Sequence, residues 1–199
     1  MAQISARTAK WAKWSVVPAA LLVSGLAVSQ ASYSAFSSTV ASPASNWASG
    51  TVVLGGPTGG NASSALFTAP NMKPGDGATK CITVTSSGSL DSSVKLYATN
   101  PTTTKNLSSN ILLTIEAGTG IEEAACEKFT STTSVYTGTL DGFGKLGTNY
   151  TTGIGAWDST GGTPETRTYK ITYKLNAGAQ NDTQGGTASV GFTWEAQNK

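Results

Sequence analysis

Hydrophobic and polar residues alternate strictly in two segments near the end of the chain. In residues 168–175, one face carries Tyr169, Ile171, Tyr173 and Leu175, and the other face carries threonine and lysine. Residues 188–195 repeat the pattern with Ala188, Val190, Phe192 and Trp194. A period of two predicts half-buried antiparallel strands, here joined by the glycine- and asparagine-rich residues 176–186.

Shorter hydrophobic runs predict further strands earlier in the chain. They cover residues 50–54, 65–68, 79–85, 94–98 and 111–117. Pro74-Gly75 predicts a type II turn before the third of these strands. Seven or more short strands separated by turns indicate an all-β fold, a jelly-roll-like antiparallel β-sandwich.

One segment departs from the strand pattern. Leu140, Phe143 and Leu146 lie three residues apart, and Thr139 precedes them as a candidate N-cap. Three glycines in this stretch weaken a helix. We therefore expect residues 140–157 to form a short helix or turn followed by a long loop on the sandwich, with Trp157 buried.

The first 34 residues have the features of a secretory signal peptide. Arg7, Lys10 and Lys13 precede an apolar run over residues 16–28, and small residues lead up to Ser34 and Ala35. The apolar run is shorter than the ~20 residues that span a bilayer. We expect signal peptidase to cleave between Ser34 and Ala35, leaving a secreted chain with no stable membrane span.

Charge and length limit what the mature chain can be. It keeps 10 of the 13 basic residues and all 11 acidic residues, so its side-chain net charge is −1. The absence of a basic surface argues against nucleic acid as a partner. About 165 residues remain, enough for one domain. We expect residues 35–48 to be an N-terminal segment and residues 49–199 the β-sandwich domain.

The inventory of reactive side chains is sparse. The chain has no histidine, which excludes a Ser-His-Asp triad and the common zinc motifs. The acidic cluster Glu122, Glu123 and Glu127 is typical of a solvated loop. We therefore expect no catalytic residue, no metal site and no cofactor, and a protein that is not an enzyme. Cys81 and Cys126 form an even pair that, in a secreted chain, predicts a disulfide; two free thiols are the alternative.

Several segments together resemble the TasA/camelysin family of secreted bacterial matrix proteins. The most specific are Asn71-Met-Lys-Pro-Gly-Asp76 and Phe192-Thr-Trp-Glu-Ala196, and the end of the signal resembles those handled by a SipW-type peptidase. The resemblance implies a jelly-roll subunit of extracellular fibres in a bacterial biofilm matrix or on the cell surface. The partners would be other copies of the chain, and a minor companion subunit is left open.

In this family the mature N-terminal segment can act as a strand donated to the next subunit. The corresponding residues are Ala35, Phe36, Ser37, Ser38, Thr39, Val40 and Ala41. Phe36 and Val40 would be the apolar pegs, and Pro43 is expected to end the strand. A flexible N-terminal tail is the alternative.

Two other functions are alternatives to the fibre subunit. Camelysin-like relatives are described as metalloproteases, but this chain has no histidine to receive that activity. A cell-surface binding module would use exposed aromatic residues and the segment 140–157.

Overall fold

The structure is a computed structural model that describes residues 37–48, 66–69, 71–120 and 126–199; for β1 and Thr68 it describes the backbone alone. The described residues of the domain form one compact unit that begins at Ser37. Its elements, in chain order, are β1 (Ser37–Ala48), β2 (Thr68–Ala69), β3 (Gly77–Ser86), β4 (Ser92–Thr103), the 3-10 turn η1 (Leu107–Asn110), β5 (Ile111–Thr119), β6 (Thr130–Thr139), α2 (Leu140–Leu146), β7 (Ile154–Ser159), β8 (Glu165–Leu175), η2 (Asn181–Thr183) and β9 (Thr187–Asn198).

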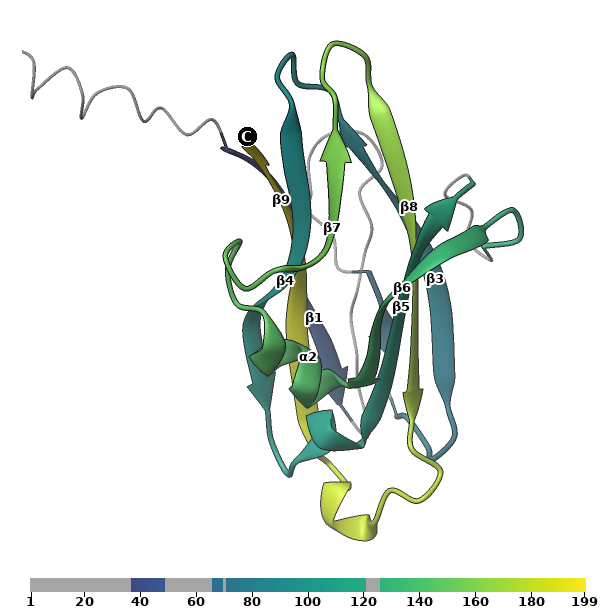
Figure 1. Cartoon of the computed structure of the whole chain (residues 1–199). Coiled ribbons are helices and arrows are strands. Elements are labelled where there is room, and N and C mark those ends of the chain that lie inside the picture. Colours follow the sequence, from purple (N-terminus) through teal and green to yellow (C-terminus); the bar gives the residue numbers. More distant parts are fainter. Residues whose placement is uncertain (1–36, 49–65, 70, 121–125) are drawn as a thin grey trace, which may run out of the picture. The chain divides into compact units, whose positions relative to one another are not determined.

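These strands form two facing sheets (Figure 1). One sheet has the order β2-β1-β9-β4-β7 and the other has the order β3-β8-β5-β6. All the pairings are antiparallel except the short parallel contact between β1 and β2. Without the two-residue β2, the eight strands follow the order of a jelly roll, in which the first strand lies beside the last. The predicted all-β, jelly-roll-like sandwich is confirmed.

The core lies between the two sheets and follows the alternation seen in the sequence. The four hydrophobic residues predicted to face inward from β8 are at most 4% exposed; they are Tyr169, Ile171, Tyr173 and Leu175. β4 and β5 contribute the same alternation, with Leu96, Ile111 and Ile115 fully buried. The predicted strands 79–85, 94–98, 111–117, 168–175 and 188–195 lie within β3, β4, β5, β8 and β9. The predicted strand 50–54 lies outside the described residues.

The connections agree with the sequence in part. The turn after Met72 is confirmed, since Gly75 has φ 94° and the Asp76 N–H donates to the Lys73 carbonyl at 2.9 Å. The strand expected over 65–68 is reduced to β2 at Thr68–Ala69.

The segment that departs from the strand pattern was predicted correctly only in its first half. α2 begins after Thr139, whose hydroxyl accepts from the Gly142 N–H at 3.1 Å, and Trp157 is buried. The long loop expected up to residue 157 was wrong, because Ile154–Ser159 pairs with β4 as β7. β6 was missed, because its Ser/Thr-rich sequence is mostly exposed and shows no alternation.

In the described residues, no helix is long and apolar enough to cross a membrane.

Candidate functional site: the sheet edge formed by β1 and β9

β1 lies antiparallel to β9, the last strand of the chain. The Cα partners run from Ser37 opposite Gln197 to Ala48 opposite Thr187. Figure 1 shows β1 beside β9. The first and last strands of the fold therefore depend on each other for their main-chain hydrogen bonds.

Among the described residues, the second side of β1 pairs with β2 alone. That contact joins only Asn46 to Thr68 and Trp47 to Ala69. An edge strand with unpaired main-chain groups is a template for further pairing.

Pro43 does not end this strand, contrary to the prediction. β1 continues to Ala48, and the register with β9 shifts between Ser42 and Ser45. A proline has no N–H to give to a ladder, so a bulge at an edge strand accommodates it. The strand that could be exchanged is thus longer than the segment 35–41 that the sequence suggested.

The predicted donor residues fall into two groups. Ser34, Ala35 and Phe36, and with them the cleavage position, lie outside the described residues. Ser37 to Ala41 lie in β1 and pair with Gln197 to Thr193 of their own chain. In a single chain, β9 therefore pairs with β1 of the same chain, and donation of β1 to another copy stays a prediction.

β9 is an unusually well buried strand, since it lies between β1 and β4. Every residue from Ala188 to Trp194 is buried. The Phe192 ring stacks on Phe143 of α2, with centroids 5.2 Å apart, and Trp194 contacts Tyr169 across the sandwich at 5.1 Å. The outward positions hold small residues such as Ser189 and Thr193. These ring contacts anchor β9 on the core.

Three aromatic side chains converge where β7, β8 and β9 meet in the core. The indole N–H groups of Trp157 and Trp194 favour the ionised form of the Tyr169 phenol, as does the charge of Arg167. Neither indole reaches hydrogen-bond geometry with the phenol oxygen. Burial outweighs all three effects and raises the pKa of Tyr169 to about 12.

A polar row lines the outer face where β9 meets β4. The Tyr97 hydroxyl donates to Glu195 Oε2 at 2.8 Å, and Gln197 Nε2 donates to Glu195 Oε1 at 2.8 Å. Burial, and then the hydrogen bond and the charge of Glu195, raise the pKa of Tyr97 to about 12. Further along, Thr102 and Ser189 share a hydrogen bond of 2.6 Å. The Tyr97–Glu195 and Thr102–Ser189 contacts tie β9 to β4 on the side opposite β1, whereas Gln197 and Glu195 both belong to β9.

The predicted cysteine pair is joined. Cys81 on β3 and Cys126 in the connection between β5 and β6 lie at disulfide distance, with Cα atoms 5.4 Å apart. Nearby, the Thr168 hydroxyl donates to the Gly120 carbonyl at 2.7 Å. These contacts join Gly120 and Cys126, which lie on either side of residues 121–125, to the second sheet. A disulfide is compatible with an extracellular location.

The acidic and cysteine side chains of the described residues do not gather in a group of three that could hold a metal ion. Glu127 is exposed, and Glu122 and Glu123 lie outside the described residues. What the β1–β9 edge offers is main-chain hydrogen bonding along a strand, which suits association. Comparison of the chain with protein-family models, with curated proteins and with solved structures finds no match.

Proposed function

We propose that this chain is a secreted structural subunit of extracellular fibres, in which β1 of one copy pairs with β9 of the next. The observation that carries the proposal is the pairing of β1, which is bound to β9 along its length but to β2 at only two positions. When identical copies exchange β1, every β1–β9 pair is broken once and remade once. Exchange of this kind is a low-cost route to assembly.

The geometry of exchange favours open filaments. A copy that gives β1 to one neighbour and receives β1 from another makes a head-to-tail contact, which extends without limit unless its rotation closes a ring. The resemblance to the TasA/camelysin family and the signal peptide support the same proposal. In this proposal the protein acts through adhesion between copies and carries out no enzymatic reaction.

Cross-linking tests exchange directly. Ala41 and Thr193 are partners in the register, at a spacing that suits a disulfide. In the variant carrying Ala41→Cys and Thr193→Cys, exchange between copies gives a ladder of covalent oligomers on a non-reducing gel. If β1 stays in its own chain, the new bond is internal and the gel shows monomer, which would refute the proposal.

A matched control uses a position out of register. Thr187 lies six residues from Thr193 on the same strand, opposite Ala48, which is a separation of roughly 20 Å. The variant carrying Ala41→Cys and Thr187→Cys should form no ladder. Electron microscopy of protein lacking residues 35–41 gives a second test, since filaments that persist without them would contradict a donor role for that segment.

A further inference from the structure

A second site lies away from the β1–β9 edge, between α2, η1 and the end of β4. The structure has a cavity here of about 160 Å³, lined by residues from these three elements and by Ser189 of β9. Local backbone features create it. The register of β4 against β9 shifts between Thr99 and Thr102, and Asn100 adopts φ 48°. This bulge turns Pro101 toward Gly144 of α2, where a Cβ atom would lie 3.0 Å from the proline ring.

The wall of the cavity contains a buried hydroxyl without a partner. Ser108 is 5% exposed, and its Oγ makes no hydrogen bond in the described residues. Its backbone N–H donates to Thr103 Oγ1 at 3.1 Å, which fixes the turn that carries it. An unsatisfied buried hydroxyl costs about 1–3 kcal/mol. Such a group in the wall of a cavity points to a ligand that hydrogen-bonds to it.

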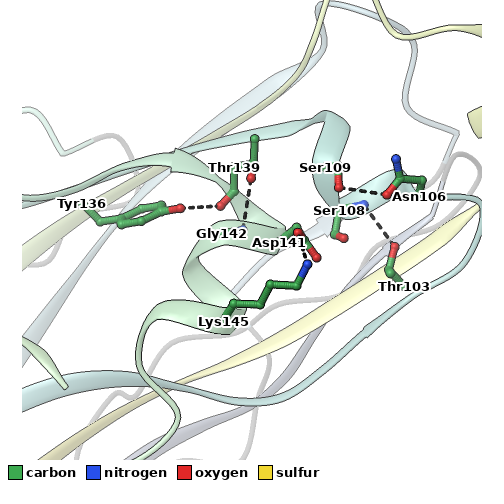
Figure 2. Close-up of polar contacts among 9 residues, drawn as sticks. All are labelled: Thr103, Asn106, Ser108, Ser109, Tyr136, Thr139, Asp141, Gly142 and Lys145. Atoms are coloured by element: carbon green, nitrogen blue, oxygen red, sulfur yellow. Dashed lines mark hydrogen bonds and ion pairs between the residues drawn. The ribbon is translucent and has the colours of Figure 1, made fainter. Parts of the chain in front are cut away.

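The charges at the cavity neutralise each other. Lys145 Nζ lies 2.7 Å from Asp141 Oδ2, one helical turn away. Figure 2 shows these two head groups on one side of Ser108 and Thr103 on the other. The ion pair places the Asp141 carboxylate at the cavity wall, where a carboxylate oxygen can accept a hydrogen bond. Asp141 and Lys145 are the two charged residues in the described lining of this cavity, so a ligand of either net charge would gain little.

Size and lining define the ligand further. An apolar cavity of about 150 Å³ binds one benzene ring. A pyranose has more heavy atoms than benzene, so only part of the sugar would lie inside this cavity, and the rest would extend through its solvent-facing opening. Pro101, Leu140 and the Gly144 backbone supply an apolar wall, and Ser108 and Asp141 supply polar groups. We propose that this cavity binds one uncharged, hydroxyl-bearing six-membered ring, such as a pyranose sugar unit. The site would make the protein a glycan-binding protein, and this inference does not depend on fibre assembly.

Titration of the purified secreted protein with glucose, galactose, mannose and N-acetylglucosamine, followed by amide NMR shifts, tests the site. At least one sugar should move the amides of α2 and η1 with a millimolar Kd, as expected for a ligand of this size. Methyl glycosides distinguish a free sugar from the end of a glycan. If the methyl glycoside still binds, the ligand is the terminal sugar of a glycan, with its anomeric oxygen directed toward solvent. If the methyl glycoside does not bind, the ligand is the free sugar.

Two substitutions separate a ligand contact from a structural effect. Ser108→Ala should weaken binding about tenfold, the loss expected for one hydrogen bond, without lowering the unfolding midpoint, because the hydroxyl has no partner to lose. Ser109→Ala is the matched control. Ser109 lies in the same turn but donates to Asn106 Oδ1 at 2.9 Å, and its removal should leave sugar affinity unchanged.

Gly144→Ala tests the cavity itself, because the added methyl group occupies space beside Pro101 and should abolish the sugar-induced shifts. The proposal is overturned if none of the four sugars shifts these amides at 100-fold the expected Kd, or if Ser108→Ala binds as tightly as the parent protein. It is equally overturned if Ser108→Ala lowers the unfolding midpoint while leaving affinity unchanged, since the serine would then be structural.

Discussion

Replacing both cysteines tests how much the fold depends on the link between β3 and the β5–β6 connection. Cys81 and Cys126 are separated by 45 positions in the sequence. The bond restricts the unfolded chain by closing a loop of that length, and the chain-entropy relation gives about 4 kcal/mol for it. The variant carrying Cys81→Ser and Cys126→Ser should lose about this much free energy of unfolding.

Urea unfolding of the two forms measures the loss. The variant should unfold at a lower midpoint than the parent and, for a domain of this size, melt roughly 8–16 °C lower. The parent treated with a phosphine reductant should behave like the variant, and the variant should not respond to the reductant. A loss below about 1 kcal/mol would refute the argument, because the unfolded chain would then gain little freedom when the link is removed.

Three further predictions concern the core and its ionisation. Thr168→Val removes the hydroxyl that donates to the Gly120 carbonyl and should lower the free energy of unfolding by about 1–3 kcal/mol. Thr166→Val, at an exposed position on the same face of β8, is the control. If urea unfolding gives both variants the same loss of free energy, the argument is contradicted. Phe143→Ala should lower the free energy of unfolding by about 3–5 kcal/mol, because the ring is 1% exposed and stacks on Phe192 of β9. Leu146→Ala is the control and should change this free energy little, because Leu146 is 53% exposed. Calorimetry that finds the larger loss for Leu146→Ala would refute this prediction. The pKa of Tyr169, about 12, lies above its usual value of 10.0, so this phenol ionises in the unfolded chain before it ionises in the folded one. The stability that Tyr169 contributes is therefore full below pH 10 and is lost as the pH rises toward 12. The alkaline loss of stability, followed by circular dichroism, should be smaller in Tyr169→Phe, and an unchanged loss of stability would contradict this.

Strands with one hydrophobic face could be predicted from the sequence alone. The residues of β8 and β9 alternate strictly between hydrophobic and polar types because the hydrophobic side of each strand packs on the core, although the polar side of β9 is buried as well. β6 gave no such signal, because its Thr and Ser side chains are exposed on both faces for most of its length. β7 was hidden by the glycines around it and by its short length.

The candidate sites were predictable to different degrees. The cysteine pair was predicted from the even number of cysteines, and the N-terminal strand was predicted from the resemblance to the TasA/camelysin family. The extension of that strand past Pro43 could be seen only from the register of β1 with β9. The cavity beside α2 could not be predicted, because it depends on a bulge at Asn100 and on a glycine that lets the helix approach β4. Neither the bulge nor the glycine produces a periodic pattern of hydrophobic residues in the sequence.

The adjacency of β1 and β9 also fixes the order in which the domain can be completed. Because β9, the central strand of the first sheet, is synthesised after all the other strands, that sheet cannot close until synthesis has passed Asn198. Contacts between the two ends of a chain are slow to form. Until β9 is made, β1 lacks the strand of its own chain with which it pairs from Ser37 to Ala48.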